Sequence, residues 1–516
     1  MPKRNIRIPF KPLNRALSAA LFVFIGLSAL LLTRAAVPTS HFEAESATVS
    51  SNTTVGSDTN ASGGKYIVFN KSSVLSCDHT INSTVTTADA RTNFSQVQPG
   101  DTVCIKSGNR SNLTLKNFHG TKAAPITFIN QGGQVVMSGT LQVSYGQHIR
   151  VTGTGDPKVK YGIKLNGSVT YGARFNYKTD YWELDHVEIA QARIGLGGNT
   201  KPSCPDGSDN DYDYDGDGKI TGDLDDAVSA GNYVAMDTYV HDNYFHDIGT
   251  EAMYLGNNSV EIKGDPCPDG SKPPASYRDG VFIYNNRLER FGWEGINIKR
   301  LQDKPGRCQV HHNVIKDGSM AFNSTTNPGQ LGGIHTENSR CDIYNNFVVD
   351  QNGPGIRDNG IGGNKIYNNV VARTGLYFPI GDTQGIAAGI VTASGGVNSS
   401  LYSVHIFNNS INSPHGNGIM IGDRSNSRVQ NNIIANPGSD YLKLRSDTTA
   451  SNNLQKATVG DVGYVNPASD DYHLTGTSPA VNAGINLSAF GVATDYDDIS
   501  RPQGNAYDIG AFEYKP

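Results

Sequence analysis

A short phrase that recurs seven times between residues 240 and 432 constrains the fold more than any other feature. Each copy is an apolar residue, two variable positions and an Asn, usually followed by β-forming residues. The Asn residues that end the copies are Asn243, Asn286, Asn313, Asn346, Asn369, Asn409 and Asn432. Their spacings are 43, 27, 33, 23, 40 and 23 residues, so 23 is the bare repeat and the longer steps carry insertions. A repeat of about 20 to 50 residues with strand-like units predicts a solenoid.

Each repeat holds at least two short strands separated by polar turns. After most copies comes a Gly-apolar unit, at Gly295-Ile296, Gly333-Ile334, Gly355-Ile356, Gly389-Ile390 and Gly418-Ile419. No segment of this region keeps a helical apolar period, so we expect no helices in it. Asn suits the corners because it tolerates left-handed backbone, and stacked Asn side chains can hydrogen-bond from coil to coil. A propeller or sandwich with Asn-rich hairpins is the alternative, but a propeller blade of about 40 residues exceeds the bare repeat.

Two further stretches carry a family resemblance. Val97-Gln-Pro-Gly-Asp-Thr-Val-Cys104, followed by Ala124-Pro-Ile-Thr-Phe-Ile129, resembles the first coils of many secreted β-helix enzymes. Together with the repeats, this N-terminal stretch makes the chain similar to right-handed parallel β-helix proteins of the pectate-lyase-like superfamily. Ser478-Pro-Ala480 and Asp508-Ile-Gly-Ala-Phe-Glu-Tyr514 closely resemble the closing segment of many bacterial secreted β-helices. We therefore expect an all-β, right-handed parallel β-helix with loop insertions and a C-terminal segment that caps the open end of the solenoid.

The sequence divides into parts of different composition. They are a leader at 1–36, an N-terminal segment at 37–76, the β-helix at 77–456 with insertions at 204–226 and 257–279, and the capping segment at 457–516. The leader is basic at its start and then apolar from Ala16 to Leu32, which predicts a secretory signal peptide or an uncleaved signal anchor. In the second part, Phe42-Glu-Ala-Glu-Ser46 resembles the start of a carbohydrate-binding module.

The leader and the net charge limit where the protein can be located and which partners it can bind. A signal peptide predicts a secreted or cell-surface protein, which touches a membrane only if the leader stays as an anchor. The net charge of -5, without a Lys/Arg-rich tract beyond the leader, argues against a nucleic-acid partner. The family resemblance implies a polysaccharide as partner, and we expect a monomer.

Six cysteines in an exported chain predict disulfides. Pairing of nearest neighbours gives Cys77–Cys104, Cys204–Cys267 and Cys308–Cys341. Cys308 and Cys341 each stand two residues before a copy of the phrase, so they occupy the same corner of adjacent coils, about one strand spacing apart. A disulfide can bridge that distance with little strain. The other two pairs follow from proximity alone.

The insertion at 204–226 carries the sharpest metal-binding motif. Its candidate ligands, spaced as in an EF-hand loop, are Asp213, Asp215, Asp217, the carbonyl of Lys219, Asp223 and Asp225. The pattern departs at the last ligand position, where Leu224 stands and Asp223 or Asp225 must substitute, and no flanking helices are evident. So many acids in one short loop repel one another without a cation. We predict bound calcium with a structural role, and a solvated acidic loop is the alternative.

Alignment of the strands around the Gly-apolar units predicts a polar cluster. One column holds Tyr254, Asn297, His335, Arg357, Val391 and Met420. The column two residues further on holds Gly256, Lys299, Glu337, Asn359, Ala393 and Gly422. Side chains in register on adjacent coils stand about 4.8 Å apart. Charged residues therefore gather on an outward face of the middle coils, as they would in a groove.

This cluster predicts a polysaccharide lyase acting on a uronate-containing glycan. Such enzymes abstract the proton α to a carboxyl group. They need a cation to neutralise the carboxylate and a Lys, Arg or His side chain to take the proton. The candidate catalytic residues are Lys299 as base, His335 or Arg357 as its partner, and Glu294 or Glu337 as calcium or orienting ligand. The candidate substrate-binding residues are Trp293, Arg300, Asp358, Tyr254 and Asn297. The alternatives are a hydrolase that pairs Glu294 with Glu337 or Asp358, a non-catalytic glycan-binding or adhesion protein, and a merely solvated face.

Overall fold

The computed structural model describes residues 53–57, 65–69, 76–176, 178–199, 234–256, 277–301, 304–321, 328–377, 385–392, 403–422 and 424–515. The chain divides into two units, residues 1–75 and 76–516. In the first, β1 (Thr53–Ser57) pairs antiparallel with β2 (Lys65–Phe69). The leader, the acidic insertion with its calcium ligands, Cys204 and Cys267 lie outside the described residues and stay predictions.

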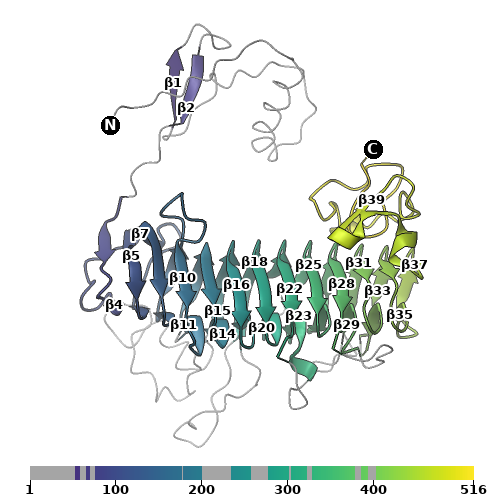
Figure 1. The fold of residues 1–516 in the computed structure, drawn as a ribbon, viewed down its shortest axis with the longest axis horizontal. Helices are drawn as coiled ribbons and strands as arrows, with labels where there is room; N and C mark the ends of the chain where they lie inside the picture. The colour runs from purple at the N-terminus through teal and green to yellow at the C-terminus, as the bar shows by residue number, and fades with distance from the viewer. Residues whose placement is uncertain are drawn as a thin grey trace, which may run out of the picture. The chain divides into compact units, whose positions relative to one another are not determined.

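The second unit is a parallel β-helix whose coils stack three rows of strands (Figure 1). The first row is β3 (His79–Ile81), β5 (Thr102–Arg110), β7 (Ile126–Met137), β9 (Gln147–Thr152), β12 (Asp180–Asp185), β15 (Val234–His241), β18 (Tyr277–Tyr284), β21 (Cys308–His311), β24 (Asp342–Tyr344), β27 (Asn364–Tyr367), β30 (Val404–Phe407), β33 (Arg428–Gln430) and β36 (Thr449–Ser451). The second row continues from the far ends of β5 and β7 with β10 (Ile163–Asn166), β13 (Val187–Ala190), β16 (Tyr244–Ile248), β19 (Arg287–Phe291), β22 (Val314–Gly318), β25 (Phe347–Gln351), β28 (Val370–Thr374), β31 (Ser410–Asn412), β34 (Ile433–Ala435) and β37 (Leu454–Lys456). The third row, which carries the candidate site, is β4 (Thr87–Asp89), β6 (Leu113–Lys116), β8 (Leu141–Ser144), β11 (Tyr171–Asn176), β14 (Ile194–Asn199), β17 (Met253–Leu255), β20 (Glu294–Lys299), β23 (Gly332–Glu337), β26 (Ile356–Asn359), β29 (Ile390–Thr392), β32 (Ile419–Ile421) and β35 (Leu442–Lys443). The predicted parallel β-helix is confirmed.

Stacks of aliphatic side chains fill the interior. The apolar residue that opens each phrase is fully buried, as at Ile283, Val310 and Ile343, and these residues pair in register from coil to coil. The second and third rows add stacks of the same kind, such as Ile296 and Ile334. Burial of one such side chain stabilises the fold by about 1.5 to 3 kcal/mol, so the stacks hold neighbouring coils together.

The repeated Asn residues form a hydrogen-bonded ladder at the corner between the first and second rows. The Asn346 Nδ2–H donates to the Asn369 side-chain oxygen at 3.0 Å and to the Val310 carbonyl at 2.8 Å. The Asn346 side-chain oxygen accepts from the backbone N–H of Asn313 at 3.1 Å and from its side-chain amide at 3.0 Å. The same pattern links all seven predicted Asn residues and continues to Asn453, which the sequence analysis did not predict. The predicted ladder is confirmed.

Left-handed backbone explains the residue before each ladder Asn. Asn345 has a φ of 52°, Asn368 of 54° and Asn408 of 49°. Asn and Asp adopt this region more readily than most residues because the short polar side chain bonds locally. His186, with a φ of 53°, occupies this same position in an earlier coil, where Val187 takes the place of the ladder Asn.

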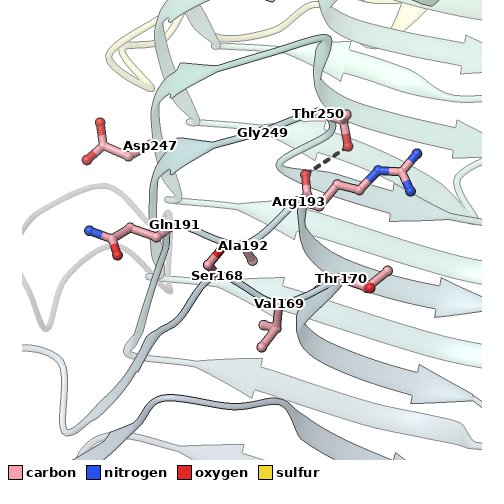
Figure 2. A pocket seen from close by; sticks show the side chains of 9 residues that line it. All are labelled: Ser168, Val169, Thr170, Gln191, Ala192, Arg193, Asp247, Gly249 and Thr250. Carbon is pink, nitrogen blue, oxygen red and sulfur yellow. Dashed lines mark hydrogen bonds between the residues drawn. The ribbon is translucent and has the colours of Figure 1, made fainter.

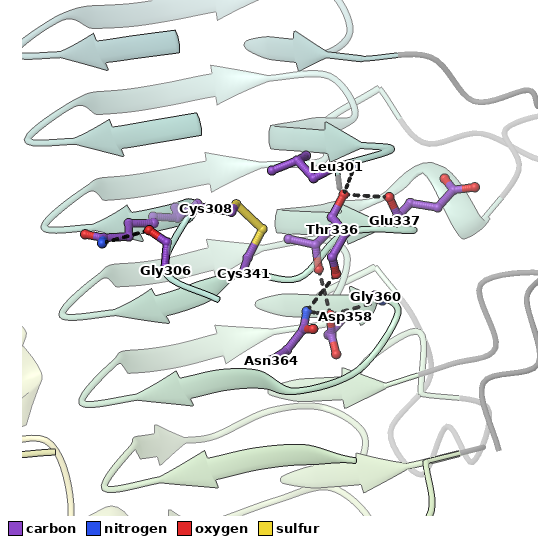
Figure 3. Close-up of a disulfide and its surroundings, with 12 residues drawn as sticks. Leu301, Gly306, Cys308, Thr336, Glu337, Cys341, Asp358, Gly360 and Asn364 are labelled. Carbon is purple, nitrogen blue, oxygen red and sulfur yellow. Dashed lines mark hydrogen bonds between the residues drawn. A yellow bond between two sulfur atoms is a disulfide. The ribbon is translucent and has the colours of Figure 1, made fainter. Parts of the chain in front are cut away.

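Two disulfides tie adjacent coils of the first row. Cys77 pairs with Cys104 at a Cα–Cα distance of 5.6 Å, and Cys308 pairs with Cys341 at 4.6 Å. Both predicted pairs are confirmed. The second one joins the first residue of β21 to the residue before β24, with Thr336 and Glu337 of β23 among its surroundings (Figure 3).

Removal of the central disulfide is expected to lower the stability of the coils around the site. Cys308 and Cys341 are 33 residues apart, and the chain-entropy model gives a loss of about 3 to 4 kcal/mol for the double Ser variant. Urea unfolding monitored by circular dichroism measures this loss. The Cys77/Cys104 double Ser variant, at the N-terminal end of the solenoid, is the matched comparison, and an unchanged midpoint for the Cys308/Cys341 variant would refute the expectation.

The C-terminal segment clamps the last coils from the side, which corrects the expectation that it covers the open end. Its backbone carbonyls accept hydrogen bonds from the left-handed corner residues Asn345, Asn368, Asn408, Asn431 and Asn452. Tyr472, Ile509 and Phe512 pack in one buried cluster with Val370 and Ile433 of the second row. The segment includes the antiparallel pair β38 (Tyr464–Asn466) and β39 (Asp471–Leu474). The side-chain amides of these corner residues need hydrogen-bond partners. A segment that lies along the side of the solenoid reaches several coils, whereas an end cap would reach only the last one.

A His between two carboxylates makes the folding of this segment depend on pH. His473 contacts Asp497 at 2.8 Å and Asp471 at 2.6 Å, and these hydrogen bonds raise the pKa of His473 to about 9 from 6.5. A raised folded-state pKa stabilises the fold fully below about pH 6.5, and the contribution is lost as the pH rises through 9. Since the side chain is half exposed, the effect is less than about 1 kcal/mol.

The expected result is that the difference in melting temperature between the native chain and His473→Gln shrinks from pH 6.5 to pH 9. Differential scanning calorimetry at several pH values measures it. A difference that stays constant over this range would show that the protonated His473 does not stabilise the segment.

Candidate functional site

The third row of strands brings the predicted residues together in the predicted register. Tyr254 lies beside Asn297, Asn297 beside His335, and His335 beside Arg357 on successive coils. Lys299 is likewise paired with Glu337. The cluster therefore draws on β17, β20, β23 and β26, and its residues meet because Ile296, Ile334 and Ile356 set the register of these strands from the interior.

The charged core of the cluster is enclosed, so the alternative of a merely solvated outward face does not describe it. The exposed fraction is 0% for Glu294, 1% for Asn297, 2% for His335, 4% for Lys299 and 8% for Arg357. Asn297 and Lys299 still project outward from the coil, because Ile296 and Ile298 occupy the inward positions beside them, and Glu294 joins this face through its hydrogen bond with His335. Solvation therefore does not account for these charges, and each needs partners or a ligand to compensate for its burial.

Three residues from consecutive coils form a hydrogen-bonded relay. The Asn359 amide donates to Nε2 of His335 at 3.1 Å, and Nδ1 of His335 lies 2.9 Å from Oε1 of Glu294. Because Nε2 accepts, the imidazole proton is on Nδ1 and is donated to Glu294. Both ring nitrogens are thus engaged, so His335 orients Glu294 and is not free to act as a base. Oε2 of Glu294 is buried without a hydrogen-bond partner.

Burial sets the protonation of the relay. It raises the pKa of Glu294 to about 7, although Lys299, Asn297 and Arg357 all favour the charged form. Burial also raises the pKa of Glu251 on the preceding coil, and the nearby charge of Glu294 raises it further. The pKa of His335 is well below its ordinary value because of burial and of the neighbouring cations. Near neutral pH, Glu294 therefore exchanges a proton readily beside a neutral His335.

Two cations face these carboxylates. The Lys299 ammonium lies 3.0 Å from Oε2 of Glu337 and 5.5 Å from the centre of the Tyr254 ring. Burial lowers the pKa of Arg357, which the charge of Glu294 opposes. The Nε of Arg357 is buried without a hydrogen-bond partner. Glu337 is the charged member of the cluster in contact with water, since 24% of its side chain is exposed.

Asp358 belongs to the interior and not to the predicted substrate-binding set. It pairs in register with Thr336, in the inward column that begins at Ile298. Its Oδ1 accepts from Thr336 at 2.7 Å, from Asn364 at 2.6 Å and from the Gly360 backbone at 3.1 Å (Figure 3). The alternation of strand side chains places it on the face opposite Arg357.

The other two predicted substrate-binding residues lie at opposite ends of β20. Arg300 is buried at a left-handed corner, where its N–H donates to the Glu337 carbonyl at 3.0 Å. Trp293, directly before Glu294, is partly exposed, and its N–H donates to the Thr250 carbonyl at 3.0 Å.

A second polar cluster, which the sequence reasoning missed, lies on the first row. Glu183, Asp185 and His241 have ligand atoms within 4.8 Å of one another and form a triad that can hold a metal ion. Arg150 already contacts Asp185 at 2.9 Å and Glu183 at 3.1 Å. Burial alone would raise the pKa of Asp185, but the hydrogen bonds from Arg150 and Thr152 keep it below its ordinary value. The Arg150 guanidinium thus supplies at this triad the positive charge that a metal ion would otherwise supply. Alignment of Leu184-Asp-His with Val240-His-Asp would have indicated the contact.

No protein-family model and no curated protein sequence matches the chain. Pectate lyase Pel9A is a similar solved structure, with 13% identity, a TM-score of 0.39, and coverage of 85% of this chain and 97% of its own. An alginate lyase from Paenibacillus sp. str. FPU-7 shows 15% identity, a TM-score of 0.35, and coverage of 73% and 99%. The GH136 lacto-N-biosidase from Eubacterium ramulus shows 13% identity, a TM-score of 0.43, and coverage of 74% and 67%.

The three stacked rows of parallel strands make the chain a parallel β-helix protein. Two disulfides between its coils fit an oxidising compartment outside the cytoplasm. Among the described residues, no helix is long and apolar enough to cross a membrane.

Proposed function

We propose that the chain is an exported polysaccharide lyase that acts on a uronate-containing glycan by β-elimination. The proposal rests on two enclosed atoms that have no hydrogen-bond partner, Nε of Arg357 and Oε2 of Glu294. Both lie beside the Lys299 ammonium. A buried donor and a buried acceptor without partners are expensive in an apolar surrounding and are typical of a site that a ligand completes. A uronate offers a carboxylate for the donor and hydroxyl groups for the acceptor.

Each residue has a separate task in the elimination. Arg357 binds the uronate carboxylate and stabilises the negative charge that develops on it when the adjacent C–H bond breaks. Lys299, in its neutral form, takes that proton, and Glu337 holds the resulting ammonium. The electron pair of the C–H bond forms the new C=C bond, and the glycosidic C–O bond to the leaving sugar breaks. Glu294, with a pKa of about 7, is placed to protonate the leaving oxygen.

Calcium is the proposed cofactor. The acidic insertion with Asp213, Asp215 and Asp217 is the first candidate site and has a structural role in the proposal. Within the enclosed cluster, calcium coordination by the carboxylates of Glu251 and Glu294 is the alternative to the acid role of Glu294, because an ion on its unpartnered Oε2 would keep Glu294 deprotonated. A calcium ion there would supply positive charge against the uronate carboxylate.

A substrate screen tests the proposal. Purified protein is incubated with pectate, alginate and glycosaminoglycans, with calcium and with chelator, and the unsaturated sugar ends are followed by ultraviolet absorbance. The proposal expects absorbance with one acidic glycan and none with its carboxyl-reduced form. Binding to a glycan without any product would instead identify a non-catalytic glycan-binding or adhesion protein.

The raised pKa values of two adjacent carboxylates favour one alternative, a glycoside hydrolase. Glu251 and Glu294 stand on neighbouring coils, and a general acid with a pKa near 7 is what such an enzyme requires. New reducing ends without ultraviolet absorbance in the same screen would identify this reaction.

A further inference from the structure

The corner between the second and third rows forms one continuous edge beside the enclosed cluster. Backbone hydrogen bonds link its residues from coil to coil: Arg193 to Val169 at 2.8 Å, Thr250 to Arg193 at 2.7 Å and Trp293 to Thr250 at 3.0 Å. The chain of bonds continues from Met320 to Phe291 at 3.0 Å, from Asn352 to Gly318 at 3.0 Å and from Leu376 to Gln351 at 3.1 Å. Six steps of about 4.8 Å make the edge from Val169 to Leu376 roughly 29 Å long.

The N-terminal part of this edge is hollowed and polar. A hollow of about 450 Å³ is lined by residues of three coils, among them Thr170, Gln191, Arg193, Asp247 and Thr250 (Figure 2). The hydrogen bond from Arg290 lowers the pKa of Asp247 to about 2, and Arg290 contacts it at 2.6 Å and 3.1 Å. The Asp247 charge is therefore compensated. The exposed Arg193 guanidinium has no such ion pair among the described residues, so it leaves the hollow with a cation for an anionic ligand.

The C-terminal part of the edge is apolar and exposed. Among the described residues the exposed large hydrophobic side chains are Met320 at 58%, Leu376 at 39%, Tyr377 at 55% and Val465 at 54%. Three of these four lie on this edge, on turns only two coils apart, and the partly exposed Trp293 lies between them and the hollow. Clustered exposed apolar side chains typically mark a binding surface, whereas single exposed ones are normal on any protein.

We propose that this edge is an extended binding track for an acidic glycan chain, with a uronate carboxylate on Arg193 and sugar rings on Trp293 and Tyr377. The inference rests on the proposed function, because the track flanks the site where that glycan would react. Trp293 directly precedes Glu294, so a chain lying on the edge passes the enclosed cluster. Aromatic rings and the soft Met thioether suit the apolar faces of sugar rings, while Gln191 and Thr170 suit their hydroxyl groups.

The track predicts affinity that depends on chain length. Affinity electrophoresis of Lys299→Ala protein in gels containing pectate, alginate or chondroitin sulfate gives the dissociation constant without turnover. Arg193→Ala, Trp293→Ala and Tyr377→Ala are each expected to weaken binding of the retained polymer roughly tenfold. For an oligosaccharide too short to span the edge, no more than two of the three losses should remain. Val465→Ala, which removes an equally exposed apolar side chain on β38, should leave binding unchanged.

The outcomes separate the track from the reaction. Loss of binding in the three variants, with no product from any glycan, would support the track and refute the lyase. Unchanged binding in all three variants, with product formed by the native chain, would refute the track and keep the lyase. The other possible occupant of the edge is a second copy of the chain, which sedimentation of the native protein and of the Tyr377→Ala variant tests. If the native protein is a dimer and the variant is a monomer with unaltered glycan affinity, the edge is a dimer interface and the proposal is overturned.

Discussion

Lys299→Met is expected to lower the rate of product formation by about 10²- to 10⁴-fold, the contribution of a positioned general base. The methionine keeps the length of the side-chain stem, so packing against Tyr254 is retained while the amine is lost. Glu337 loses its partner at 3.0 Å, but its side chain is 24% exposed and water can replace the ammonium. We therefore expect a loss of stability of only about 1 to 2 kcal/mol. Initial rates on the glycan found in the screen, with urea unfolding of the same samples, measure both quantities.

Lys365→Met is the matched control for this variant. Lys365 also pairs with a carboxylate on the neighbouring coil, Asp342 at 3.1 Å, but it lies on β27 of the first row. It should lose a similar amount of stability and retain the rate of the native chain. A Lys299→Met protein as active as this control would show that the proton is taken by another group.

Asn346→Ala is expected to lower the free energy of unfolding by about 3 to 5 kcal/mol, the largest effect on stability that the ladder predicts. The substitution removes the oxygen that accepts from both the backbone and the side-chain N–H of Asn313. It also removes the donor to the Val310 carbonyl. All these groups are buried, and each unsatisfied one costs about 1 to 3 kcal/mol. Urea unfolding with hydrogen exchange of the neighbouring coils measures the loss.

Asn453→Ala at the last rung provides the internal comparison. Its side chain makes the same kinds of bonds, with Asn432 and with the Val429 carbonyl at 2.7 Å, but it is only partly buried. Water can satisfy the freed groups there, so the expected loss is about 0.5 to 1.5 kcal/mol. Equal losses at the two rungs would show that the ladder does not derive its strength from burial.

Much of the fold could be predicted from the repeated pattern of the sequence. The spacing of the ladder Asn residues predicted the coils, because a residue that bonds to its own copy above and below must recur once per coil. The same register predicted the Cys308–Cys341 bridge and the neighbours Asn297, His335 and Arg357. Asn453 was missed because its phrase lacks the aliphatic start and ends the series.

The site itself could be predicted only in part. Strand register identifies which side chains are neighbours, and it correctly grouped Lys299 with Glu337. It does not say which face of the strand a residue occupies when both faces carry polar groups, so Asp358 was assigned outward although it is bonded inside the coil. It also says nothing about enclosure, which converts Glu294 from an ordinary surface acid into a carboxyl with a pKa of about 7.

The sequence by itself thus determined the architecture of this protein, since the periodic Asn and aliphatic residues act through contacts with their own repeats one coil away. Only the tertiary structure decided the protonation and the roles within the cluster. The burial of Glu294 and the hydrogen-bond direction from Asn359 through His335 depend on groups brought together from three coils. The lateral attachment of the C-terminal segment was decided in the same way, because the corner amides it binds are presented by successive coils and not by any one stretch of chain.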